Sequence, residues 1–158
     1  MPEPLAELVM RRIDQVVSLY HRLIMVVAQA GAGKTAALRN VHQRGGAPMI
    51  NVNLELSRRM LDLTERQRAL QLPRLLADLV NTSETDLVLL DNIEVLFDVS
   101  LKQDPLRLLQ GLSRNKTVVV AWSGIADGEY LVYATPDHPE YRRYPVRDII
   151  VVQPEVTS

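Results

Sequence analysis

A glycine-rich stretch contains the residue types that could bind a phosphate group. It spans residues 28–35 and reads AQAGAGKT. Glycine lets a backbone wrap closely around phosphate oxygens because it has no Cβ. Successive backbone N–H groups can then form a nest for an anion. We expect Lys34 to place its charge on the phosphates and the Thr35 hydroxyl to bind a metal ion that accompanies them.

The flanking residues give this stretch the context that a phosphate-binding P-loop requires. An apolar run at 23–27 predicts a strand before it, and residues 36–44 predict a helix after it. The positive end of the helix dipole adds to the attraction for an anion. The predicted phosphate-binding residues are Ala30, Gly31, Ala32, Gly33, Lys34, Thr35 and Ala36.

One position departs from the pattern G-x-x-x-x-G-K-S/T. Ala28 stands where the first glycine is expected, and its methyl group restricts φ without removing a phosphate ligand. A glycine-rich turn that binds nothing is the alternative interpretation. The strand before the loop and the helix after it favour the P-loop.

A second segment ends in a carboxylate. Residues 87–91 read LVLLD, which is typical of a strand buried on both faces of a parallel sheet. Asp91 would then lie at the C-terminal end of that strand, where open α/β sheets bind ligands. This is the form of a Walker B segment. We therefore expect Asp91 to hold Mg²⁺ opposite Thr35, with ATP as the cofactor.

Composition limits the class of protein. The 158 residues predict one domain, 1–158, and 47% hydrophobic residues can fill its core. The net charge of −1 gives no support for nucleic-acid binding. There is no cysteine, no secretory signal and no apolar run long enough for a membrane, so a cytoplasmic protein that does not enter a membrane is expected.

Five arginines make one part of the chain locally basic: Arg58, Arg59, Arg66, Arg68 and Arg74. We interpret them as the solvated face of a helix, with a DNA contact as the alternative.

Periodicity and turn residues predict the remaining elements. Helices are expected at 5–21, from the capping box at 64–67, from Pro73 onward and at 105–112, and a short helix or turn at 54–63. The first of these lies within an N-terminal segment, 1–22, expected to pack on the core. Further strands are expected at 48–53, 117–122, 129–134 and 148–152, with a turn at Asp127-Gly128 and a loop at 135–145.

This order of elements resembles the additional-strand class of P-loop ATPases, which includes the AAA+ proteins. One strand lies between the two Walker segments. The resemblance implies a three-layer α/β fold with a mostly parallel central sheet of strand order 5-1-4-3-2. It also implies that Ser123, which ends the fourth strand, is the γ-phosphate sensor, where Asn or Thr is more usual.

Four segments are similar to a particular family, BrxF: residues 50–57, 90–94, 101–114 and 138–142. BrxF is the small P-loop protein of some BREX (bacteriophage exclusion) defence systems. The resemblance implies a role in phage defence alongside larger BREX proteins, including a methyltransferase and another ATPase.

Two departures from the AAA+ pattern bear on catalysis. Asn92 follows Asp91 where a glutamate is usual, which leaves Glu94 as the candidate base, with a solvated or capping role as its alternative. Six residues follow Val152, and no C-terminal helical lid is expected in them.

These departures make a homo-oligomer the expected active form. Arg142 and Arg143 lie where AAA+ proteins place the arginine that completes a neighbour's site, or they are solvated loop charges. Two functions stay open: a weak or partner-stimulated ATPase, and a nucleotide-gated assembly module that does not hydrolyse. The preference for ATP over GTP also stays open.

Overall fold

The computed structural model describes residues 4–147 and 149–154. They form a sheet built from seven strands: β1 (Leu23–Ala28), β2 (Met49–Asn51), β3 (Leu87–Asp91), β4 (Thr117–Ala126), β5 (Tyr130–Tyr133), β6 (Arg142–Pro145) and β7 (Ile150–Val152).

The main part of the sheet is parallel, and its strand order is β2-β3-β4-β1-β7. If β7 is counted as the fifth of these parallel strands, this is the predicted order 5-1-4-3-2 read from the opposite edge. The end of β4 then pairs antiparallel with β5, and β5 with β6. The predicted α/β class with a mostly parallel sheet is confirmed.

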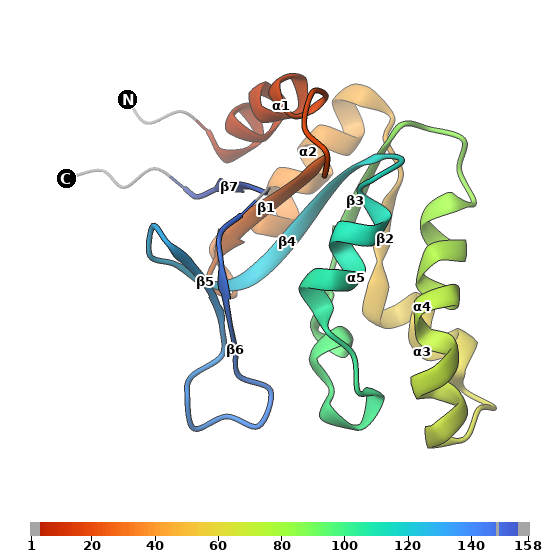
Figure 1. Cartoon of the computed structure of the whole chain (residues 1–158). Coiled ribbons are helices and arrows are strands. Elements are labelled where there is room, and N and C mark those ends of the chain that lie inside the picture. The colour runs from red at the N-terminus through yellow and green to blue at the C-terminus, as the bar shows by residue number, and fades with distance from the viewer. Residues whose placement is uncertain (1–3, 148, 155–158) are drawn as a thin grey trace.

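Helices cover both faces of this sheet (Figure 1). They are α1 (Leu5–Val16), α2 (Lys34–Gly45), α3 (Val52–Met60), α4 (Glu65–Asn81) and α5 (Pro105–Leu112), with two short 3-10 helices, η1 (Glu94–Phe97) and η2 (Val99–Leu101). None of the helices in the described ranges is both long enough and apolar enough to cross a bilayer.

Alternation along β1 divides the core into two layers, because successive side chains of a strand point to opposite faces. Leu23 and Met25 pack with α3, α4 and α5, whereas Ile24 and Val26 pack with α1 and α2. All four side chains have no exposed surface. A strand buried on both faces reads as a continuous apolar run, as residues 23–27 do.

Helix α4 corrects the prediction that a new helix begins at Pro73, because it runs through that residue without a break. A proline inside a helix removes the hydrogen bond to the carbonyl four residues earlier, here Ala69. The side-chain amide of Gln103 donates to that carbonyl across 2.7 Å. A residue remote in sequence therefore satisfies the group that Pro73 leaves unpaired, and the helix continues.

The region after β4 also differs from the prediction. β4 continues to Ala126 rather than ending at Trp122, so Ser123 lies within it. The predicted turn is present, with Gly128 at φ 91° and β5 returning along β4. The predicted loop 135–145 contains β6, an edge strand; Pro145 is tolerated there because an edge strand can leave one side of its backbone unpaired.

Two further boundaries are shorter than predicted. α1 ends at Val16 instead of residue 21, since the chain turns back through a hydrogen bond from the Leu19 amide to the Val16 carbonyl. β2 ends at Asn51, whose side chain accepts from the Leu54 amide and so begins α3. For the last predicted strand, 148–152, β7 begins at Ile150, and residue 148 lies outside the described residues.

Candidate phosphate-binding site

The glycine-rich stretch forms an exposed loop between the end of β1 and the start of α2. Gly31 and Gly33 have φ values of 81° and 94°, a region that side chains with a Cβ rarely enter. Ala28, in contrast, is the last residue of β1 and its φ is not positive. The missing first glycine therefore puts no strain on this loop.

Lys34 lies at the base of the loop and is only 7% exposed. Its ammonium donates to the carbonyls of Gln29 (2.8 Å) and Ala28 (3.0 Å), so it spans the inside of the loop. Burial lowers the pKa of Lys34, although the nearby carboxylates of Glu94 and Asp91 act in the opposite direction. The loop thus holds one partly desolvated cation beside two carboxylates.

Thr35 and Asp91 meet at the edge of the sheet where the parallel strands end. The Thr35 hydroxyl donates to the Asp91 carboxylate across 2.9 Å, and Asp91 is 6% exposed. Register places Asp91 next to Asn51 on β2. The sequence predicted that Thr35 and Asp91 would lie opposite one another, and the fold brings them into contact.

Glu94 and Ser123 form a second pair in the same region. The Ser123 hydroxyl donates to Glu94 Oε1 across 3.3 Å, while Glu94 Oε2 is buried without a hydrogen-bond partner in the described chain. Ser123 lies beside Ala28 in the register of β4 and β1. The two residues proposed from sequence as base and sensor therefore contact each other next to the loop.

Asn53 holds the backbone that carries Glu94, and sequence reasoning did not find this role. Its side-chain oxygen accepts a hydrogen bond from the backbone amide of Val95 (2.8 Å), and its backbone amide donates to the Asn92 carbonyl (2.9 Å). Asn92 adopts φ 51°, a left-handed conformation that asparagine tolerates better than most residues. The one sequence feature that pointed to Asn53 was its position in residues 50–57, a segment that resembles BrxF.

Aromatic rings lie behind Glu94 and connect it to the β5–β6 hairpin. Phe97, the last residue of η1, stacks on Tyr133 with ring centroids 3.6 Å apart, and meets Trp122 edge-on at 5.2 Å. Burial, together with the charges of Glu140 and Glu94, raises the pKa of Tyr133 to about 12. Tyr133 thus stays neutral beside the candidate base at physiological pH.

A pocket of about 550 Å³ opens beside the Thr35–Asp91 pair, between α2 and β2. Arg39 lines it from α2, one helical turn after Thr35, and has no ion-pair partner among the described residues. The sequence analysis overlooked this cation, although its spacing of four residues from Thr35 places both on one helix face.

Arg142 and Arg143 are not brought to this site within one chain. Arg142 donates to the Gln103 carbonyl across 3.2 Å, and the Arg143 guanidinium lies 3.6 Å from the centre of the Tyr130 ring. Both lie on β6, which pairs with β5. Their predicted action on a neighbouring subunit stays a prediction.

Compared with protein-family models and with curated proteins, the chain matches none.

Proposed function

We propose that this protein binds ATP with Mg²⁺ at the loop 28–35 and hydrolyses it slowly, with stimulation by partner proteins. The observation that carries the proposal is the hydrogen bond between Thr35 and Asp91, beside a loop that holds Lys34 in its interior. A hydroxyl and a carboxylate placed together at the start of a helix suit a metal ion that accompanies phosphates.

The donor set fits Mg²⁺. Thr35 and Asp91 offer oxygen atoms, which Mg²⁺ prefers, and this ion commonly takes only one or two protein ligands with the rest from phosphates and water. Among the described residues there is no group of three His, Asp or Glu side chains that could enclose a metal unaided. When bound, Mg²⁺ would neutralise charge that develops on the phosphates.

Glu94 is the residue that we propose as the general base. Its free Oε2 atom can accept a proton, and its charge reaches Lys34. Ser123 would orient it through the other oxygen. Asn92, which directly follows Asp91, cannot accept a proton, and this supports the second candidate: an assembly module that binds nucleotide without hydrolysis.

The biological setting is proposed from the resemblance of four segments to BrxF alone. We infer a cytoplasmic component of a BREX-type phage-defence system that works with other BREX proteins and with further copies of itself.

Phosphate release tests the hydrolytic part. In Glu94→Gln the shape and the acceptor for Ser123 are kept, while the proton acceptor is lost. Turnover should fall by about 10²- to 10⁴-fold with ATP affinity retained. Glu84→Gln, in an exposed loop, is the matched control and should leave turnover unchanged. Equal turnover in Glu94→Gln would contradict the role of Glu94. No phosphate release from the wild type, alone or with partners, would favour the assembly module.

A further inference from the structure

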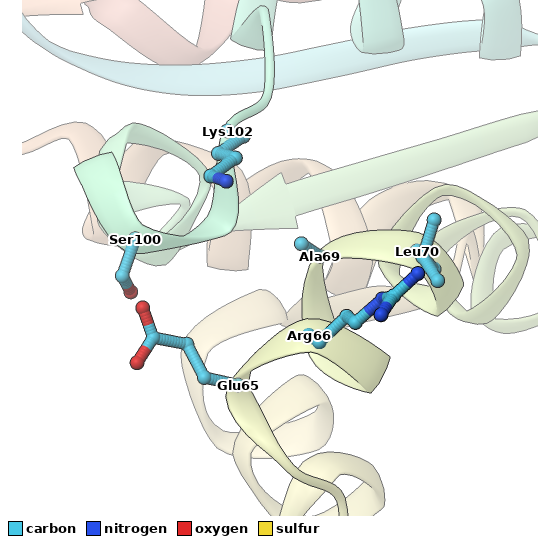
Figure 2. Close-up of a pocket in the computed structure, with 6 residues that line it drawn as sticks. All are labelled: Glu65, Arg66, Ala69, Leu70, Ser100 and Lys102. Atoms are coloured by element: carbon cyan, nitrogen blue, oxygen red, sulfur yellow. The ribbon is translucent and has the colours of Figure 1, made fainter.

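A groove lies between the first turns of α4 and the η2 segment, outside the phosphate-binding site. Its six lining residues enclose about 480 Å³: Glu65, Arg66, Ala69, Leu70, Ser100 and Lys102. Figure 2 shows Lys102 reaching into the groove from the η2 side, while Glu65 points toward Ser100 from α4. An adjoining hollow of about 390 Å³ shares Glu65 and Ser100 with it. We refer to both together as the α4–η2 groove.

The rim of this groove is unusually apolar for a surface. Leu61, Leu70 and Val99 are 74%, 72% and 57% exposed. Leu61 lines one hollow and Leu70 the other, and Val99 belongs to the η2 segment between them. Grouped exposed apolar side chains with a polar surround are typical of protein contact sites.

Two cationic side chains in the groove, Arg66 and Lys102, have no partner among the described residues. Across residues 4–147 and 149–154, neither Arg66 nor Lys102 has a side-chain hydrogen bond or an ion pair. Neighbouring arginines differ: Arg59 pairs with Glu55, and Arg68 donates to backbone carbonyls. Both positive charges are therefore available to pair with carboxylates of another molecule.

The tip of the β5–β6 hairpin, residues 134–141, has the opposite charge. Asp137 is exposed, and the Thr135 hydroxyl donates to it across 2.6 Å, which lowers the pKa of the Asp137 carboxyl. His138 caps the turn by accepting from the Glu140 amide at 3.0 Å. The tip is thus a preformed turn that presents two carboxylates, Asp137 and Glu140, and two prolines.

We propose that the hairpin tip of one copy docks in the α4–η2 groove of a second copy, with Asp137 and Glu140 facing Arg66 and Lys102. The prolines of the tip would cover the apolar rim. Because tip and groove are different surfaces, the contact is head-to-tail and can extend to a ring or a filament. This deepens the homo-oligomer part of the proposed function, and it does not require that nucleotide binds.

Within one chain the tip is directed away from the groove. Arg142, which pairs with Tyr133 next to the tip, donates to the Gln103 carbonyl, and the hairpin lies on the other side of the segment that carries Lys102 from α4 (Figure 1). Glu65 and Asp98 repel any anionic occupant of the groove. A nucleic-acid backbone fits the groove less well than the tip, because it offers only charged phosphates to the apolar rim, whereas the tip carries two prolines beside its two carboxylates.

Docking would also act on the candidate base. Val95 and Asp98 line the groove. Val95 is the residue after Glu94 in η1, and Asp98 is the residue at which η1 ends. A neighbour bound there contacts the segment that orients Glu94, which gives assembly a route to stimulate turnover.

Charge reversal tests the contact. The groove variant carries Arg66→Glu and Lys102→Glu, and the tip variant carries Asp137→Lys and Glu140→Lys. Mass would be measured over a range of protein concentrations by sedimentation, with and without Mg-ATP. The measured mass of the wild type should exceed the 17.8 kDa of one chain. For each variant alone, the association constant should fall at least about a hundredfold.

An equal mixture of the two variants should restore association, because each acidic groove then meets a basic tip and each basic groove an acidic tip. Arg12→Glu, on α1 at the other face of the sheet from α4, should assemble like the wild type. A wild type that stays monomeric, variants that assemble normally, or a mixture that does not recover would each overturn the proposal.

Nucleotide binding measured on the same samples separates this inference from the proposed function. Both variants should bind Mg-ATP as the wild type does. If the wild type assembles but binds no nucleotide, the proposed function fails and the docking contact stands. If a double variant does not fold, the same exchange can be made with one substitution in each variant: Lys102→Glu in the groove variant and Asp137→Lys in the tip variant.

Discussion

The hydroxyl of Thr35 donates a hydrogen bond to the carboxylate of Asp91 across 2.9 Å, although 56 positions separate the two residues in the sequence. One parallel strand, β4, lies between the strands that lead to them: β1 precedes the loop and α2, and β3 ends in the carboxylate. The contact therefore depends on the whole strand order and not on local sequence.

Replacing Asp91 by Asn should affect the metal more than the fold. Asparagine keeps an oxygen that can accept from Thr35, but it removes the negative charge that attracts Mg²⁺. We expect Mg²⁺-dependent ATP binding to weaken at least tenfold while the melting temperature of the nucleotide-free protein stays unchanged. Calorimetric titration with and without Mg²⁺ measures the first quantity. A sharp fall in the melting temperature would instead make Asp91 a structural residue.

Gln103 should stabilise α4 through the carbonyl that Pro73 leaves unpaired. Gln103→Ala removes the donor to Ala69 and should cost about 1 kcal/mol of unfolding free energy. Pro73→Ala restores a backbone N–H at that place, so the same Gln103→Ala change in the Pro73→Ala background should cost less. Denaturant unfolding of the four proteins gives the coupling energy directly. Equal costs in both backgrounds would show that Gln103 and Pro73 act independently.

Gly124 should be indispensable for the join between the parallel sheet and the hairpin. A Cβ there would lie 2.0 Å from the Val132 carbonyl oxygen and 2.9 Å from Trp122 Nε1. Trp122 Nε1 donates a hydrogen bond of 3.1 Å to that carbonyl oxygen. Gly124→Ala should therefore cost about 1–3 kcal/mol or more. Gly111→Ala in α5 meets open space and should stabilise by about 0.5–1 kcal/mol. Thermal melting compares the two, and similar values would contradict the close approach.

Local signals predicted much of this fold. The capping box at Thr64 begins α4 with both of its hydrogen bonds, and the Asp104 side chain accepts from the Arg107 amide to begin α5. The strand order followed from the resemblance to the additional-strand class and is confirmed. These features depend on neighbouring residues or on a pattern of elements that recurs in many proteins.

Tertiary contacts account for what the sequence did not predict. Nothing local indicates that Gln103 would satisfy Ala69, so Pro73 was interpreted as a helix start. The four residues of β6 follow a stretch rich in proline, and their pairing with β5 is what makes them a strand. The role of Asn53 beneath Glu94 likewise depends on a contact across 42 positions.

The matched substitution for the central claim is Lys34→Met, which keeps the length of the side chain and removes its charge. Burial lowers the pKa of Lys34, so its protonated form is less favourable in the folded protein than in the unfolded chain. Between the lowered pKa of Lys34 and 10.5, the unfolded chain binds more protons than the folded protein. The unfolding free energy therefore rises with pH across that window. Below the window Lys34 is protonated in both states, and the folded protein bears the full cost of burying its charge. Lys34→Met removes this cost together with the two hydrogen bonds to the Ala28 and Gln29 carbonyls, so each protein is compared with its own melting temperature without nucleotide.

The most direct measurement is the melting temperature of the wild type and of Lys34→Met with and without saturating Mg-ATP. At about a hundred times its dissociation constant, a ligand that binds only the folded state adds roughly 2.7 kcal/mol, or about 5–10 °C for a domain of this size. We predict that rise for the wild type and none for Lys34→Met. No rise in the wild type, or an equal rise in both proteins, would contradict nucleotide binding at this loop.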